Sequence, residues 1–94
     1  MEKAYQLYVY GHVQGVGFRY LTKMLADQLK LSGMVKNLPD SRVYIEIQGP
    51  SLTVSQFISA IKSNPSPAGR VDQVDIKPLA LDKKRQDFVI YYYS

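Results

Sequence analysis

The stretch "GHVQGVGFRY", residues 11–20, places three glycines around a glutamine and follows them with an arginine. Before it, residues 4–11 alternate apolar and polar side chains, which is the pattern of a half-buried strand. From Phe18 onward, apolar residues recur at helical spacing up to a glycine stop at Gly33. The stretch therefore predicts a glycine turn that joins a first strand to a first helix.

A second helix is predicted around the sequence "LTVSQF". Thr53 fits the N-cap of a capping box and Gln56 its third helical position, while Leu52 and Phe57 form the apolar pair that flanks it. We expect this helix to stop at Asn64, which precedes a proline. Its apolar stripe and that of the first helix then need one apolar sheet face to cover.

The other strands are predicted by apolar or alternating segments that end in turn residues. They cover residues 34–40, 42–49, 70–79 and 88–93, the first two as a hairpin. The order of elements is thus β, α, β, β, α, β, with an extra or broken final strand. This order predicts an α+β fold of the ferredoxin-like split βαβ type, with a mostly antiparallel sheet and both helices on one face.

The composition limits the chemistry that the chain can carry. The chain has no cysteine and one histidine, His12, so thiolate chemistry is excluded and a metal site would depend on carboxylates. The formal net charge of +4 favours anionic small molecules or nucleic acid without choosing between them. No apolar run is long enough for a signal peptide or a membrane helix. We expect a single soluble domain, residues 1–94, that acts as a cytoplasmic monomer without metal, other cofactor or membrane partner.

The glycine turn is a candidate site for an anion. Gly15 and Gly17 allow backbone conformations in which successive N–H groups point inward. The N-terminus of the first helix follows directly, and Arg19 adds a guanidinium that can bind two phosphoryl oxygens. The simpler interpretation is that the glycines only make the turn. The sequence matches neither a Walker loop nor the dinucleotide fingerprint, which needs a third glycine.

"GHVQGVGFRY" followed by "GMVKNLPD" closely resembles the acylphosphatases. These are small enzymes of ferredoxin-like fold that hydrolyse acyl phosphates without a metal. The resemblance implies that Arg19 binds the phosphate and that Asn37 orients the attacking water. The expected phosphate-binding residues are Gln14, Gly15, Val16, Gly17, Phe18 and Arg19. Inorganic phosphate or sulfate would compete with the acyl phosphate for this site.

The sequence departs from the family pattern in three places. Met34 stands where an aromatic residue is frequent, and Ser41 stands where glycine is common. Residues 64–70 only loosely resemble the usual loop before the fourth strand. These departures bear on the rim of the pocket, and hence on substrate preference, rather than on Arg19 or Asn37.

The predicted topology also brings Arg19 and Asn37 together. In the split βαβ plan the first two strands run parallel with the third between them, so their C-terminal ends lie about 10 Å apart. Arg19 follows the end of the first strand, and Asn37 lies near the end of the second. A phosphate held in the turn would sit between them with room for one water.

Two other functions were considered. RNA-recognition domains share this topology and stack bases on aromatic residues, a role open to Tyr8, Tyr10 and Tyr44. Glu46 would place a negative charge on that platform, and the strand lacks the basic aromatic pattern of such domains. Acylphosphatase-like domains also occur inside larger hydrogenase-maturation proteins, so a regulatory or carbamoyl-transfer role is a further alternative. We expect His12 to face solvent and residues 82–87 to form a solvated turn.

Overall fold

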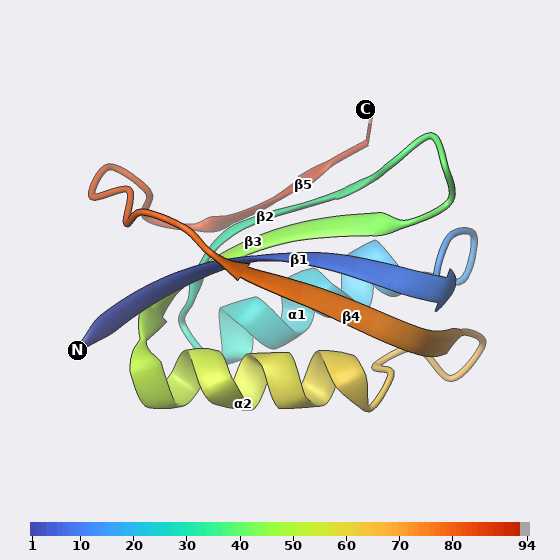
Figure 1. Cartoon of the computed structure of the whole chain (residues 1–94), viewed down its shortest axis with the longest axis horizontal. Coiled ribbons are helices and arrows are strands. Elements are labelled where there is room, and N and C mark those ends of the chain that lie inside the picture. Colours follow the sequence, from blue (N-terminus) through green and yellow to red (C-terminus); the bar gives the residue numbers. More distant parts are fainter. Residues whose placement is uncertain (93–94) are drawn as a thin grey trace.

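The computed structural model describes residues 1–92, so the end of the last predicted strand lies outside the described residues. Figure 1 shows a sheet with two helices packed against one of its faces. In chain order the elements are β1 (Glu2–His12), α1 (Phe18–Gln28), β2 (Ser32–Asn37), β3 (Val43–Pro50), α2 (Ser51–Lys62), β4 (Arg70–Pro78) and β5 (Phe88–Tyr91). The predicted ferredoxin-like order, including the extra final strand, is confirmed.

The strands form one sheet in the order β4-β1-β3-β2-β5. β3 lies antiparallel between β1 and β2, so these two strands run parallel to each other. β4 pairs antiparallel with the other side of β1, and β5 pairs parallel with β2. The C-terminal ends of β1 and β2 therefore meet at one edge of the sheet, as the predicted topology required.

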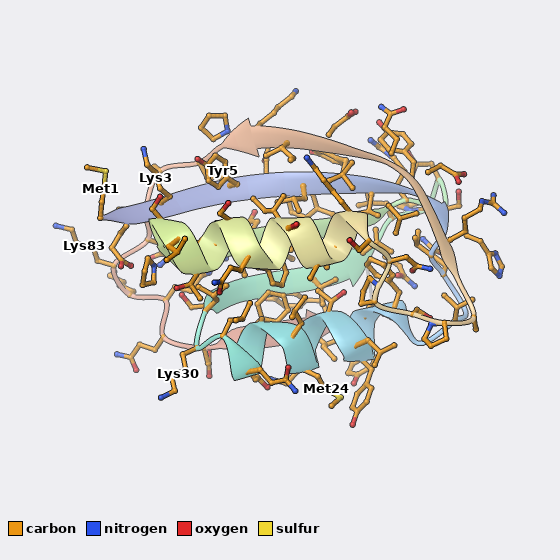
Figure 2. All side chains as sticks on the ribbon, turned by 90° about the horizontal axis from the view of Figure 1, so that it is seen from below. Met1, Lys3, Tyr5, Met24, Lys30 and Lys83 are labelled. Carbon is orange, nitrogen blue, oxygen red and sulfur yellow. The ribbon has the colours of Figure 1, made fainter. Side chains whose placement is uncertain are left out.

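The core lies between the sheet and the helices (Figure 2). Leu7 and Val9 of β1 are fully buried, and Phe57 and Ile61 of α2 have no exposed surface either. Burial of each such side chain contributes about 1.5–3 kcal/mol to folding. Tyr8 alternates with the buried residues of β1 and lies on the face without helices, so the predicted two-sided pattern of this strand is confirmed.

The predicted glycine stop of the first helix is wrong. α1 ends at Gln28, and Lys30 takes the left-handed conformation that closes the helix, with φ of 58°. The N–H groups of Lys30 and Leu31 bond back to the last helical turn. Gly33 instead lies inside β2, where the backbone of Glu46 comes so close that a Cβ atom would collide with it. The close approach of β3, and not the end of the helix, therefore requires glycine at position 33.

The predicted capping box of the second helix is also wrong. α2 begins at Ser51, directly after Pro50, and no side chain of the described residues caps it. The N–H of Ser51 donates to the backbone carbonyl of Met1 at 2.8 Å, so the N-terminal strand supplies a partner that sequence cannot reveal. Thr53 lies inside the helix, and Leu52 is 73% exposed and cannot form the predicted apolar pair.

Lys30, just after α1, and Gly33, inside β2, give opposite predictions for stability. Lys30→Gly should raise the free energy of unfolding by about 0.5–1 kcal/mol, because glycine adopts the left-handed conformation without steric cost. Gly33→Ala should lower it by about 2 kcal/mol or more, because the Cβ would force β2 and β3 apart. Urea unfolding measures both. Gln56→Gly, within α2, is the control for a glycine inside a helix and should destabilise by roughly 0.5 kcal/mol. A destabilising Lys30→Gly would contradict this account.

Candidate active site

The turn between β1 and α1 has the conformation that its glycines suggested. Gly15 and Gly17 have φ of 75° and 77°, in the left-handed region. A Cβ atom at either position would meet nothing within 4 Å, so the backbone conformation, and not a lack of space, calls for glycine. Gly17 is the N-cap of α1, and no described side chain caps the helix. The first N–H groups of α1 and the positive end of its dipole are thus available to an anion.

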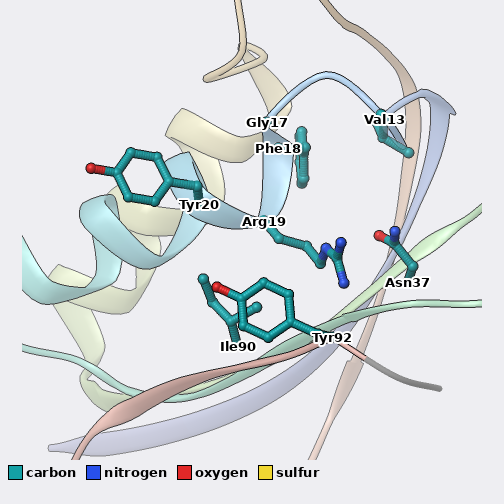
Figure 3. A pocket seen from close by; sticks show the side chains of 9 residues that line it. Val13, Gly17, Phe18, Arg19, Tyr20, Asn37, Ile90 and Tyr92 are labelled. Atoms are coloured by element: carbon teal, nitrogen blue, oxygen red, sulfur yellow. The ribbon is translucent and has the colours of Figure 1, made fainter.

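Arg19 extends from the first turn of α1 toward Asn37 (Figure 3). Its Nη1 donates to the backbone carbonyl of Tyr91 at 3.0 Å, and its guanidinium carbon lies 5.3 Å from the ring centroid of Tyr92. A guanidinium carries five N–H donors, so this anchor leaves most of them for a ligand. The end of β5 therefore fixes the direction of the arginine without using up its binding capacity.

Asn37 is the last residue of β2 and lies across the cavity from Arg19. Its Oδ1 atom is buried and accepts no hydrogen bond from the described residues. Leaving a buried acceptor unpaired costs about 1–3 kcal/mol. An acceptor held in this state at the wall of a cavity is suited to a water molecule that donates to it.

A cavity of about 160 Å³ joins the turn, Arg19 and Asn37. The residues that line it are Val13, Gly15, Gly17, Phe18, Arg19, Tyr20, Asn37, Ile90 and Tyr92. Five of the seven residues predicted from the sequence are therefore in one place. The other two, Gln14 and Val16, belong to the same turn but are not among these lining residues.

Gln14 and Val16 tie the turn to neighbouring segments. The side-chain Nε2 of Gln14 donates to the carbonyls of Leu38 and Arg42, each at 2.9 Å. The carbonyl of Val16 accepts from Ser66 Oγ at 2.6 Å, and Ser66 is fully buried. Both contacts hold the turn from outside the cavity.

The roles of Ser66 and of the C-terminal aromatic residues have no signal in the sequence. Asn64, in the left-handed conformation, accepts from the N–H of Ser66 and donates to the carbonyl of Gly69, which shapes the loop before β4. A serine in a proline-rich loop carries no signal of burial. The sequence pattern predicts only a strand at Tyr91 and Tyr92. The contact of Arg19 with Tyr91, which lies 72 positions later in the chain, has no local signature in the sequence.

An ion pair between Asp40 and Arg42 stabilises the turn after Asn37. Arg42 Nε donates to the Asp40 carboxylate at 2.8 Å, and this hydrogen bond lowers the pKa of the Asp40 carboxyl. The guanidinium of Arg42 also lies 4.8 Å from the ring centroid of Tyr8 on the open sheet face. Ser41, which lies between Asp40 and Arg42 in the chain, has φ of 79°, a conformation that favours glycine. The backbone conformation therefore explains why glycine would suit position 41.

Two further properties of the described residues bear on the site. Among residues 1–92, no group of three or more histidine, cysteine or carboxylate side chains is placed to share a metal ion. His12, the only histidine, is exposed at the end of β1, as predicted. Neither helix in this part of the chain has the length and apolar character needed to cross a membrane.

The fold and this site define a small α+β domain in which a glycine turn at a helix N-terminus faces a buried amide. Comparisons with known proteins identify its family. The family model for acylphosphatases matches residues 5–90. The acylphosphatase of Pediococcus pentosaceus is 49% identical over 96% of this chain and 99% of its own length. The chain therefore belongs to the acylphosphatase family and is an enzyme of that class, as its motifs predicted.

Solved structures of related proteins have the same fold. The crystal structure of acylphosphatase from Bacillus subtilis superimposes with a TM-score of 0.90, at 39% identity, and covers 98% of this chain and 100% of that one. HypF from T. kodakarensis also matches, with a TM-score of 0.84 and 32% identity. That match covers 98% of this chain but 12% of HypF, so the fold also forms one part of a longer protein.

The geometry predicts where an anion binds. Titration with inorganic phosphate, followed by amide NMR, should shift the resonances of Gly15, Gly17 and Arg19 most, because these residues line the cavity at the N-terminus of α1. Lysines and arginine at 83–85 serve as the internal control, since they are basic but lie outside the cavity. Shifts centred on residues 83–85 would mean that the turn is not the anion site.

Proposed function

We propose that this chain hydrolyses acyl phosphates to a carboxylate and inorganic phosphate, with the phosphoryl group bound in the turn and water oriented by Asn37. The observation that carries the proposal is a cavity lined by Arg19, by the buried Asn37 and by the N-terminus of α1. Within residues 1–92, no group donates to Asn37 Oδ1 and no side chain caps this helix. This arrangement offers one place for an anion and an adjacent place for a water.

The reaction needs little from the protein beyond binding and orientation. A water oxygen attacks phosphorus in line with the bridging oxygen, the bond between phosphorus and that oxygen breaks, and its electrons leave with the carboxylate. The conjugate acid of this leaving group has a pKa of about 4, so no strong general acid is required. The dianion of the acyl phosphate and one water thus give a carboxylate and dihydrogen phosphate.

The phosphoryl group is held by backbone and by one cation. Backbone N–H groups of residues 14–19 and the positive end of α1 surround its oxygens. Arg19, directed by Tyr91 and Tyr92, binds the same oxygens with the donors that remain free. As charge shifts over these oxygens in the transition state, preorganised donors stabilise it without reorganisation.

Asn37 acts on the water. The water donates a hydrogen bond to Asn37 Oδ1, and this bond points a lone pair of the water oxygen toward phosphorus. An amide is not a base at neutral pH, so the proton lost by the water passes to an oxygen of the phosphoryl group, as the family resemblance implies. The role of Asn37 is therefore orientation.

The same site explains which molecules compete. Inorganic phosphate and sulfate present the oxygens that the turn and Arg19 bind, and both should inhibit competitively. We propose that no metal or other cofactor takes part, since the chain has no cysteine and a single exposed histidine. We also propose a single domain that works as a cytoplasmic monomer, which sedimentation and cell fractionation would test.

An RNA-binding role has less support. On the open sheet face the Arg42 guanidinium lies 4.8 Å from the Tyr8 centroid and 5.5 Å from that of Tyr10. The Lys36 ammonium lies 5.6 Å from the centroid of Tyr44. The rings that a base would need for stacking are therefore occupied by side chains of the same protein.

We predict that hydrolysis of acetyl phosphate persists when a chelator such as EDTA is present. The chemistry relies on backbone N–H groups and Arg19 rather than on a Lewis acid. Release of inorganic phosphate measures it, with a phosphomonoester as the control that should not be hydrolysed, because its alkoxide is a poor leaving group. Activity that is lost with the chelator and restored by a divalent ion would overturn metal independence.

Substitutions at the two site residues should have different effects. Arg19→Ala should lower kcat/KM by about two orders of magnitude or more, near 3 kcal/mol, and should also weaken phosphate inhibition. Asn37→Ala should lower kcat by about a hundredfold but leave the phosphate inhibition constant within a few fold, because orienting water adds little to product binding.

Arg85→Ala is the matched control. Arg85 pairs with Glu46 and is not among the residues that line the cavity, so kcat should stay near that of the wild type. Thermal unfolding must show that each variant is folded. If Asn37→Ala kept a normal kcat, or lost phosphate affinity as severely as Arg19→Ala, its assigned role would be refuted.

A further inference from the structure

The side chain of Gln14 joins the two halves of the site. Its Nε2 donates to the carbonyl of Leu38, the residue after Asn37, and to the carbonyl of Arg42, the residue before β3. Arg42 O also accepts from the N–H of Leu38 at 2.8 Å, so these two residues close the turn that follows Asn37. We propose that Gln14 is a positioning residue that sets the distance between the phosphate turn and Asn37. The proposal rests on the function proposed above.

The sheet does not provide this link by itself. β1 pairs with β3 only as far as Val9 opposite Val43, and beyond that point β1 pairs with β4. Val43 is also the partner of Asn37 at the end of β2. The phosphate turn, residues 13–17, therefore lies past the point where β1 leaves β3. In the part of the chain that the structure describes, the two bonds from Gln14 join this turn to residues 37–42.

The hydrogen bonds of Gln14 leave its side chain no capacity to bind phosphate. An amide NH₂ group has two N–H donors, and the two carbonyls account for both. Its remaining polar atom, the carbonyl oxygen, would repel a phosphate oxygen. Gln14 is also absent from the described residues that line the cavity. Its side chain must therefore act through the segments that it connects.

Position matters here because two separately held groups must meet at one phosphorus atom. The phosphate is fixed by the turn and Arg19, whereas the water is fixed by Asn37. A misplacement of about 1 Å between reacting groups can cost roughly a hundredfold in rate. Loss of the Gln14 bonds would let the turn after Asn37 move relative to the phosphate, and would lower kcat without changing the phosphate ligands.

A double-substitution cycle between Gln14 and Asn37 tests the proposal. Gln14→Met keeps the length of the side chain but has no donor. It should lower kcat about 10- to 100-fold in the otherwise unchanged chain, with the phosphate inhibition constant changed less than about threefold. In the Asn37→Ala background the same substitution should lower kcat less than about threefold, because the group that it positions is already gone.

Gln6→Met is the matched control. Gln6 accepts from the Tyr44 hydroxyl on the open face, away from the cavity, so kcat should not change.

Gln14→Glu is a second test, because the introduced carboxyl group has no hydrogen-bond donor when it is ionised and gains one when it is protonated. Its kcat relative to the wild type should rise as the pH is lowered through the titration of this carboxyl group.

Three outcomes of these kinetic measurements would overturn the proposal. Equal losses from Gln14→Met with and without Asn37 would show that the two residues act independently. A loss of phosphate affinity as large as the loss of kcat would make Gln14 a ligand. Gln14→Glu activity that is flat with pH relative to the wild type would exclude a donor role.

One readout does not depend on activity. Gln14→Met should shift the amide resonances of residues 38–42, while Gly15 and Gly17 should still respond to phosphate. Unshifted resonances of residues 38–42 would refute the proposed role of Gln14. A wild type that fails to hydrolyse any acyl phosphate would refute the proposed function, and the amide spectrum would still decide the role of Gln14.

Discussion

The site depends on a helix N-terminus that no described side chain caps. The side-chain oxygen of a serine or aspartate at the N-cap would accept a hydrogen bond from one of the first N–H groups of α1. Gly17 occupies that position instead, in a left-handed conformation that turns the chain into the helix. The orphan N–H groups and the helix dipole are then left for a ligand. Glycine at the N-cap costs a helix only roughly a few tenths of a kcal/mol relative to serine or aspartate, so these N–H groups are left without a side-chain partner at little loss of stability.

The sheet topology supplies the second half of the site. β1 and β2 run parallel on either side of β3, so Asn37 lies at the same edge as the turn. Contacts from distant segments then hold each part. The end of β5 directs Arg19, Ser66 holds the turn at Val16, and Gln14 links it to the strand connection after Asn37. Each of these three contacts is made between a side chain and a backbone carbonyl of a distant segment.

Features with a local physical cause could be predicted from the sequence. The alternation of β1, the helical period after Phe18 and the glycine turn led to the correct fold, and the topology then placed Arg19 near Asn37. Errors arose where a distant segment competes with a local signal. Gly33 is required by the backbone of Glu46, and the N–H of Ser51 finds its partner in Met1. The buried Ser66 and the Gln14 bonds are likewise long-range, so residue type and spacing carry no trace of them.

In the proposed reaction a water held by Asn37 attacks phosphorus. Hydrolysis of acetyl phosphate in water labelled with oxygen-18, followed by mass spectrometry of both products, tests it most directly. Attack on phosphorus puts the labelled oxygen in the inorganic phosphate and leaves the acetate unlabelled. We expect labelled phosphate and unlabelled acetate after correction for the uncatalysed reaction. Label in the acetate would show that water attacks the acyl carbon, and would contradict the roles assigned to the turn, Arg19 and Asn37.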